Sequence, residues 1–355
     1  MKISDYVSKY DPQNQFKVLV ETYTQIEYAW NNEFNLDAIK DLKIDSILVN
    51  GLGGSAISAD LMKNFLNGEL NVPFLVNRNY FLPKFVNKNS LVIISSYSGN
   101  TEETFSVLEE AIKNEFSIVC ITTGGKIEKL ANEKNIPVVK LRKGYQPRYA
   151  LGISFFSLLK VLQKLSLIQN QDSIVKKIIS LWKKKGEEYS REEPVSPLAS
   201  QGGNAAYNYA EKIIGFIPLI YSADDLTSAI GYRFKCQFNE NSKLHAFHNV
   251  IPELNHNELV GWETFSDKQM NAKLLNILDK SYHSQTKKRF QITSELAAQN
   301  KVEATNFESN ESELKVRLMD LVYLFDWITY YAAILRGYDP SEIKNIDSMK
   351  KRLKE

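Results

Sequence analysis

The sequence predicts an α/β protein of two domains, each a parallel sheet flanked by helices. Strand-like apolar runs alternate with helical patterns from Asp45 onward, and the same rhythm returns after residue 200. The length of 355 residues also exceeds the roughly 100–200 residues of one domain. We therefore expect an N-terminal helical segment over residues 1–44, a first domain over 45–182 and a second over 201–355.

In the first domain, short and continuously apolar runs indicate strands buried on both faces, as in parallel sheets. Between them, helical patterns cover Ala56 to Leu66 and Glu102 to Lys113, and a long amphipathic stretch closes the domain near Ile168. The runs expected to form strands are SILVNGLGG, PFLVNRN, LVIISSYSGN, SIVCITT and IPVVKL.

The stretch from Lys183 to Ser200 is charged, contains two prolines and lacks apolar periodicity, so we expect a surface linker over residues 183–200. After it, IIGFIPLIYSAD predicts a strand and SAIGYRFKCQFNENSK a helix. LKVRLMDLVYLFDWITYYAAIL predicts a long buried helix ending at Gly337.

Composition excludes several classes of function. The 44 Lys and Arg residues nearly balance 42 Asp and Glu, and this net charge of +2 predicts no nucleic-acid or membrane partner. Cys120 lies in an apolar run far from Cys236, as expected in a reducing cytoplasm. The polar N-terminus has no signal-like segment, and no CxxC or HExxH spacing indicates a metal site.

A glycine-rich turn follows the first predicted strand. In VNGLGGSAISAD, glycines and Ser55 stand between a strand and a helix, where backbone N–H groups can approach an anion. Ala56 replaces the third glycine of a GxGxxG dinucleotide fingerprint, so we expect a phosphate or sugar cradle centred on Gly54. The alternative is a turn that serves close packing alone.

A hydroxyl-rich turn follows the strand in IISSYSGNTEET. Ser96, Ser98 and Thr101 stand at the carboxyl end of that strand and the start of a helix, the edge at which open α/β sheets bind ligands. Hydroxyls and the helix dipole together can hold a dianion. The alternative is that Ser98 or Asn100 merely caps the helix.

The succession GLGGSAI, SYSGNTEET and QPRYALG resembles the first sugar-isomerase (SIS) domain of the bifunctional phosphoglucose/phosphomannose isomerases. The resemblance implies two SIS domains, with the sugar phosphate bound by Ser55, Ser96, Ser98, Thr101 and the backbone of Gly54. It also implies that Arg148 stabilises charge on the enediolate intermediate. A guanidinium suits that role because it stays charged and presents a planar fork.

The second domain carries the segment QFNENSKLHAFHNVIPELNHNELVGW, dense in histidines and carboxylates. By resemblance, Glu240 of NENSK is the base that moves a proton between C1 and C2, and His256 of ELNHNE helps to open the sugar ring. His245 and His248 have no counterpart. Taken without the resemblance, Glu240 is a solvated helix-end charge and His256 a loop histidine.

The C-terminal IDSMK matches a family pattern in which a lysine assists ring opening, and this implies that role for Lys350. Lys344 and Lys351 are its neighbours, and a plain basic helix is the alternative. Ala56 and Ala59 depart from family glycines, and Gln285 to Glu313 reads as a polar insert.

The function so implied is aldose-ketose isomerisation of glucose 6-phosphate and mannose 6-phosphate with fructose 6-phosphate, without a redox cofactor. The resemblance also implies a homodimer in which His256 reaches the neighbouring subunit's site. A non-catalytic sugar-phosphate-binding regulator is the alternative, although a sensor needs no base such as Glu240. An amidotransferase-linked reading lacks its N-terminal cysteine, because the first cysteine is Cys120.

Overall fold

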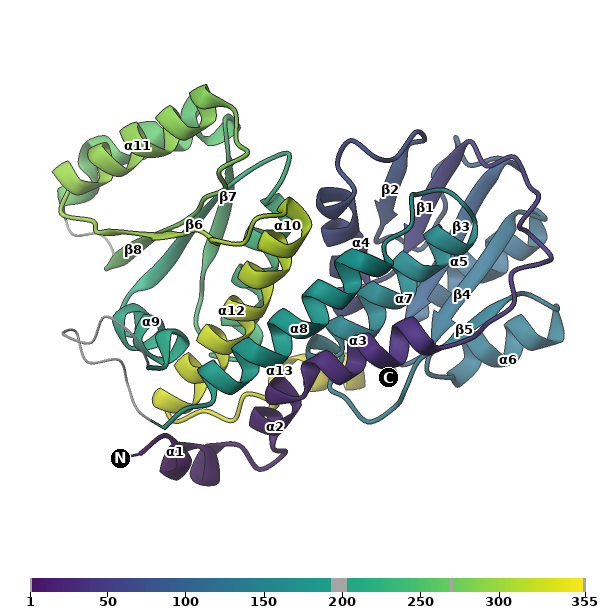
Figure 1. Cartoon of the computed structure of the whole chain (residues 1–355), viewed down its shortest axis with the longest axis horizontal. Coiled ribbons are helices and arrows are strands. Elements are labelled where there is room, and N and C mark those ends of the chain that lie inside the picture. Colours follow the sequence, from purple (N-terminus) through teal and green to yellow (C-terminus); the bar gives the residue numbers. More distant parts are fainter. Residues whose placement is uncertain (1, 193–202, 268–270, 354–355) are drawn as a thin grey trace. The chain divides into compact units, whose positions relative to one another are not determined.

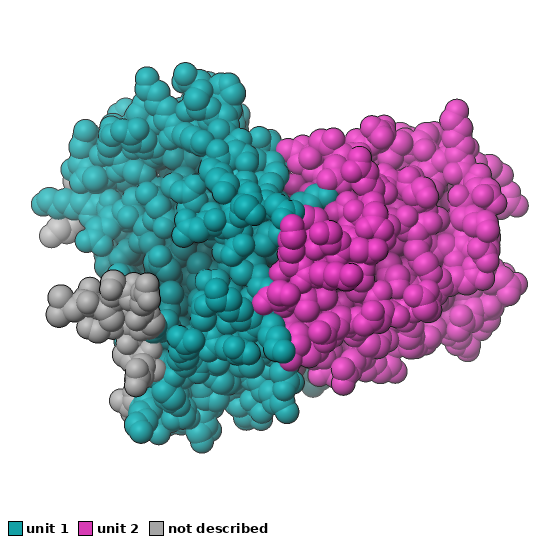
Figure 2. Space-filling view, in the orientation of Figure 1, with its two compact units in different colours: residues 1–21, 181–355 teal, residues 22–180 magenta. Residues whose placement is uncertain are grey.

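A computed structural model describes residues 2–192, 203–267 and 271–353 of the chain. Two compact units are present, coloured separately in Figure 2. Unit 2 comprises Thr22–Ser180, and unit 1 comprises Met1–Glu21 with Leu181–Glu355. Each unit holds one parallel sheet (Figure 1), which confirms the predicted α/β class with two sheets.

Unit 2 contains a five-stranded sheet in the order β2-β1-β3-β4-β5, with every neighbouring pair parallel. All five apolar runs predicted as strands are strands, and β1 and β3 are buried along their whole length. The bounds are β1 Ser46–Asn50, β2 Phe74–Asn77, β3 Ser90–Ser96, β4 Ser117–Thr122 and β5 Val138–Lys140.

The helices of unit 2 lie on both faces of this sheet. The crossovers from β1 to β2 and from β3 to β5 run in opposite directions, so right-handed connections place α4 on one face and α5 and α6 on the other. Helix α7 packs against both α3 and α4. The bounds are α3 Thr22–Asn31, α4 Gly53–Phe65, α5 Glu102–Lys113, α6 Gly125–Glu133 and α7 Leu151–Lys164.

Unit 1 contains a four-stranded parallel sheet in the order β7-β6-β8-β9. Its strands are β6 Ile217–Ala223, β7 Phe247–Ile251, β8 Ala272–Ile277 and β9 Ala304–Phe307. The other elements are α1 Ile3–Tyr10, α2 Gln15–Val20, α9 Ala205–Ile213, α10 Ser228–Glu240, α11 Ser284–Gln299, α12 Leu314–Leu335 and α13 Lys344–Arg352, with 3-10 turns η2 Glu253–His256 and η3 Glu258–Asp267. Helix α8, Asp172–Tyr189, passes from unit 2 into unit 1.

Both sheets have the same local order around their first strand. In unit 2 the chain leaves β1 toward β2 on one side and continues through β3 on the other, and β6 stands between β7 and β8 in the same way. The carboxyl ends of β1 with β3, and of β6 with β8, are therefore topological switch points, where open α/β sheets bind ligands.

Helix α12 is the core helix of unit 1. Within the described residues it alone is long and apolar enough to cross a membrane, and 83% of that apolar window is buried inside the protein. It ends before Gly337, whose φ of +78° is the left-handed conformation expected at a helix end. The prediction of a long buried helix ending there is confirmed.

Two predictions about the second half are wrong. Lys183 to Tyr189 continue α8 instead of starting a linker, because Trp182 and Tyr189 are buried and Lys184 pairs with Glu188 one turn later. Residues 193–200 of that predicted linker lie outside the described part of the chain.

The second correction concerns Gln285 to Glu313, which reads as an insert in the sequence. It contains most of α11 and all of β9, so it completes the sheet of unit 1. The segment reads as polar because α11 buries only Phe290, Thr293 and Ala297.

Candidate active site

Two glycines in the turn after β1 are packed too tightly to carry a side chain. A Cβ on Gly51 would lie 2.8 Å from the backbone oxygen of Ser95, and one on Gly54 would lie 2.8 Å from the backbone oxygen of Pro147. Close packing is thus a real reason for these glycines. Its consequence is that the start of α4 lies directly against the 3-10 turn Pro147–Tyr149, which carries Arg148.

Hydroxyl groups gather at the carboxyl end of β3. The Oγ of buried Ser96 lies 2.9 Å from Oγ1 of Thr101 and accepts a hydrogen bond from the Gly99 N–H at 3.1 Å. Ser55, on α4, accepts from the N–H of Tyr97 at 3.2 Å. Ser55, Ser96 and Thr101 therefore meet at the switch point between β1 and β3.

Ser98 differs from the other three hydroxyl residues. It is exposed, and its Oγ accepts from the N–H of Asn100 at 3.3 Å. The N-cap of α5 is Thr101, so neither Ser98 nor Asn100 occupies the helix cap that the alternative reading required. Ser98 thus presents its side chain to solvent beside the buried hydroxyls.

A second glycine turn, which the sequence reasoning missed, supports the Ser96–Thr101 loop. Gly99 has φ +68°, and a Cβ there would lie 1.6 Å from the backbone oxygen of Gly124, so only glycine fits. The N–H of Ile127 donates to the Gly99 oxygen at 3.0 Å, and that of Lys126 donates to Asn100 Oδ1 at 3.1 Å. The signal available in the sequence was the Gly-Gly pair directly after the predicted strand SIVCITT.

Tyr97 connects this loop to the segment before Arg148. Its hydroxyl donates to the backbone oxygen of Arg142 at 3.0 Å and accepts from the N–H of Tyr145 at 3.0 Å. Burial raises the pKa of Tyr97, so the phenol stays protonated and can donate. Tyr97 is a positioning residue that the sequence analysis also missed.

Arg148 is 5% exposed, and its guanidinium carbon lies 5.9 Å from the ring centroid of Tyr149. A guanidinium keeps its charge when buried and presents five donors in a fixed fork. Together with the neighbouring hydroxyls and the start of α4, it makes this edge of the unit 2 sheet suitable for an anionic, hydroxylated ligand.

In unit 1, Glu240 is the last residue of α10 and is half-buried. A carboxylate at a helix carboxyl end opposes the helix dipole, a cost of about 0.3–1 kcal/mol. The Lys243 ammonium compensates, because it donates to the backbone oxygens of Glu240 at 3.1 Å and Asn241 at 3.2 Å. An acid at this position indicates a role other than helix stability.

Two sets of bonds fix the helix end that carries Glu240. Arg233 on α10 forms a buried ion pair with Asp326 on α12, with Nη2 and Oδ1 2.8 Å apart. The turn after Glu240 is held by Asn241 Nδ2, which donates to Thr329 Oγ1 at 3.1 Å, and by Ser242 Oγ, which donates to the Thr329 oxygen at 2.7 Å. Glu240 therefore stands on a rigid α10–α12 pair.

The turn after Glu240 also contacts the segment that leads to α13. Lys243 donates to the backbone oxygen of Asp339, and Arg336 donates to that of Ser242. Helix α13 begins a few residues further on; none of its described side chains is buried, and Lys350 is exposed. The segment that starts α13 thus lies at the same end of the sheet as Glu240.

His256 lies at the other end. Glu240 precedes β7, whereas His256 follows it, exposed at the end of η2. Five residues of strand span about 16 Å. The sheet of unit 1 therefore keeps these two predicted catalytic side chains at opposite edges and does not bring them together.

His248, which had no predicted role, is part of the β6–β7 packing. Its Nε2 lies 2.8 Å from Ser222 Oγ, and a Cβ on Gly231 would lie 2.4 Å from that nitrogen. Burial, with a smaller contribution from the charge of Lys235, lowers the pKa of His248 to about 4. The ring is neutral at pH 7, as a structural histidine.

The fold defines the class: an SIS-fold protein whose unit 2 sheet has a polar edge with hydroxyl groups and Arg148. The solved C-terminal domain of glucosamine-fructose-6-phosphate aminotransferase from Francisella tularensis has the same fold, with a TM-score of 0.67, 15% identity, and coverage of 92% of this chain and 97% of that one. Residues 203–353 match the family described as the bacterial phospho-glucose isomerase C-terminal SIS domain.

Sequence relatives make the family specific. The chain is 36% identical to the bifunctional phosphoglucose/phosphomannose isomerase of Caldicellulosiruptor bescii, covering 93% of this chain and 96% of the relative. It is 34% identical to the enzyme of that name from Aquifex aeolicus, covering 96% and 98%. The chain belongs to the family of bifunctional phosphoglucose/phosphomannose isomerases.

Proposed function

We propose that this protein interconverts glucose 6-phosphate and mannose 6-phosphate with fructose 6-phosphate through a cis-enediol. The observation that carries the proposal is the meeting of the Gly54 turn, the Ser96–Thr101 loop and the Arg148 turn at one switch point. Those groups suit a phosphorylated and hydroxylated ligand. Membership of the isomerase family supplies the reaction class.

The proposed roles divide between binding and proton transfer. The phosphate oxygens accept hydrogen bonds from Ser55, Ser96, Ser98, Thr101 and the backbone of Gly54. Arg148 stabilises the oxyanion that develops as the carbonyl becomes an enediolate.

Proton transfer falls to unit 1 in this proposal. Glu240 takes the proton from C2 of the open aldose and returns it to C1, so one carboxylate serves both transfers. His256 and Lys350 exchange protons with the ring oxygen and the C1 hydroxyl during ring opening, and an imidazole suits this step because it can both accept and donate a proton. Return of the proton to either face of C2 gives the glucose or the mannose epimer.

Purified protein assayed separately with glucose 6-phosphate and mannose 6-phosphate, by following fructose 6-phosphate, tests this function. Glu240→Gln should lower kcat about 10²–10⁴-fold for both sugars while fructose 6-phosphate still binds. Glu263→Gln, at an exposed glutamate of η3, is the matched control and should leave kcat unchanged. Absence of turnover by the unmodified chain, with sugar phosphate still bound, would instead support a regulatory binding protein.

The proposal includes a cytoplasmic homodimer with composite sites. The separation of Glu240 and His256 along β7 supports it, because a partner subunit can supply the histidine that the same sheet holds away. Exposed apolar side chains on and beside this edge strand also favour a partner: Tyr232 is 41%, Phe247 53% and Val260 62% exposed.

Subunit complementation tests the composite site. A mixed dimer of Glu240→Gln and His256→Gln chains has one site with both changes and one with neither, if each site takes Glu240 and His256 from different subunits. Random pairing of equal amounts should recover about a quarter of the activity of the unmodified protein. If both residues of a site come from one chain, the mixture should stay as inactive as its components.

A further inference from the structure

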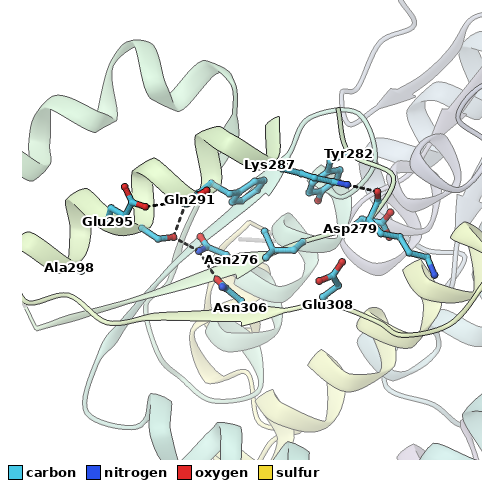
Figure 3. A pocket seen from close by; sticks show the side chains of 13 residues that line it. Asn276, Asp279, Tyr282, Lys287, Gln291, Glu295, Ala298, Asn306 and Glu308 are labelled. Atoms are coloured by element: carbon cyan, nitrogen blue, oxygen red, sulfur yellow. Dashed lines mark hydrogen bonds between the residues drawn. The ribbon is translucent and has the colours of Figure 1, made fainter. Parts of the chain in front are cut away.

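Unit 1 contains a cavity that none of the proposed isomerase residues lines. It has a volume of about 550 Å³ and lies between α11 and the carboxyl ends of β8 and β9 (Figure 3). This volume lies within the roughly 300–1,000 Å³ typical of small-molecule sites. We name it the α11 pocket, and its lining includes Asn276, Lys280, Lys287, Phe290, Asn306 and Glu308.

The floor of the α11 pocket holds an unused buried acceptor. Asn276 is 1% exposed, and its Nδ2 donates to Ser294 Oγ at 2.8 Å and to Asn306 Oδ1 at 2.9 Å. Its Oδ1 is buried and has no hydrogen-bond partner among the described residues. A buried acceptor left without a donor costs about 1–3 kcal/mol, so a ligand N–H at this point would be strongly favoured.

The two ends of the α11 pocket differ in charge. At one end Lys287 Nζ donates to the backbone oxygen of Lys280 at 2.6 Å, and Lys280 Nζ donates to that of Glu311 at 2.9 Å. Each ammonium has three N–H donors, so both retain capacity for an anion. The nearby carboxylate of Asp279 is already paired with Arg317, whose Nε lies 2.7 Å from Oδ2.

The remaining wall suits a ring and a diol. Phe290 and Tyr282 are stacked with ring centroids 5.7 Å apart, and with Leu278 and Ala298 they give the cavity its apolar lining. Figure 3 shows Glu295 and Ala298 at the end away from Lys287, with Glu308 below the cavity on the side of β9. A carboxylate just after a strand of such a sheet is the group that binds a ribose diol in nucleotide sites.

We propose that the α11 pocket binds a nucleoside monophosphate whose base carries an exocyclic amine, such as AMP. The amine donates to Asn276 Oδ1, the ribose hydroxyls donate to Glu308, and the phosphate accepts from Lys280 and Lys287. This site lies beyond the proposed isomerase function, and no residue is shared between them. A nucleotide bound here would add to the stability of unit 1.

Calorimetric titration of the full chain with AMP, with fructose 6-phosphate present at saturation, tests the proposal. AMP should bind with a Kd between about 1 µM and 1 mM. IMP, in which a carbonyl replaces the amine, should bind at least about tenfold more weakly, as should adenosine and ribose 5-phosphate.

Two adjacent exposed lysines on α11, Lys287 and Lys288, give a matched pair of variants. Lys287→Gln should weaken AMP binding about tenfold or more, whereas Lys288→Gln, which does not line the cavity, should not. Glu308→Gln should lower the affinity for AMP but leave the affinity for phosphate compounds without a ribose unchanged.

Three results would overturn the proposal. Equal affinity for AMP and ribose 5-phosphate would mean that no base is recognised. Unchanged AMP binding in Lys287→Gln would place AMP elsewhere, and loss of all AMP binding under saturating fructose 6-phosphate would place it at the isomerase site. Failure of the isomerase proposal alone leaves the AMP titration unaffected, so the two are distinguishable.

Discussion

The two sheets share an arrangement around their first strand but use their switch points differently. In unit 2, glycines and small hydroxyl residues line the ends of β1 and β3. In unit 1, Tyr282 fills the corresponding place: its hydroxyl bonds with Thr227 Oγ1 after β6 and donates to the backbone oxygen of Ile277 at the end of β8, 2.9 Å away. The same topology thus supports a polar, hydroxyl-rich edge in one sheet and a packed core in the other.

This difference teaches how binding and proton transfer can be separated within one duplicated fold. Unit 2 prearranges a polar edge through backbone contacts that only glycine allows. Unit 1 carries its predicted acid-base groups on a helix end, a 3-10 turn and an exposed helix. The unit 2 interactions fixed by backbone packing should therefore be sensitive to small displacements, whereas the predicted acid-base groups of unit 1 should be sensitive to subunit assembly.

Among the variants that test this difference between the units, the largest expected effect concerns Arg148 in unit 2. Arg148→Lys keeps the charge but loses the planar fork, so kcat should fall about 10²–10³-fold with a smaller change in KM. Steady-state kinetics with fructose 6-phosphate measures both constants. Arg142→Lys, at an exposed arginine of the preceding loop, is the control; an equal loss there, or a change in KM alone, would remove Arg148 from transition-state stabilisation.

A smaller effect should follow from adding a methyl group at Gly54. Gly54→Ala places a Cβ 2.8 Å from the Pro147 oxygen and must push the Arg148 turn away from α4, at a cost of about 1–3 kcal/mol in unfolding free energy. KM should rise with it, because the same contact positions the phosphate-binding turn. Gly261→Ala, at a glycine with open space around its Cβ position, should change neither quantity. An unaltered KM in Gly54→Ala would show that the cradle tolerates displacement.

The smallest effect tests the pH sensitivity of unit 1 through His248. Its folded-state pKa of about 4 lies below the ordinary value of 6.5, so the unfolded chain binds a proton that the folded chain does not, and stability falls as pH drops from about 6.5 toward 4. At pH 5 this loss is about 2 kcal/mol relative to pH 7. Urea unfolding of His248→Gln should show a correspondingly smaller difference between pH 7 and pH 5.

His245→Gln is the control for that measurement, because His245 is exposed and lies two residues before β7, the strand that carries His248. Its difference in unfolding free energy between pH 7 and pH 5 should match the unmodified protein. A His248→Gln curve that matches it as well would mean that His248 is protonated alike in the folded and unfolded chains.

How far the sequence predicted the fold depended on how local the signal was. The five strands of unit 2 and helix α5 were predicted because buried parallel strands and an amphipathic helix leave periodic patterns within a few residues. Helix α11 and strand β9 were misread because little of α11 is buried and β9 alternates weakly. The charged end of α8 was misread because part of its stabilisation comes from a distant core residue, Tyr323, whose ring lies against those of Trp182 and Tyr189.

The sequence alone determined the α/β class and the chemistry available at each strand end, because strand burial, glycine and hydroxyl residues act through their immediate neighbours. Only the tertiary structure decided that Gly99 must meet Gly124, that Tyr282 fills one switch point, and that β7 separates Glu240 from His256. These facts depend on contacts between segments far apart in the chain. No local sequence pattern encodes such contacts, because the two partners become neighbours only when the sheet forms.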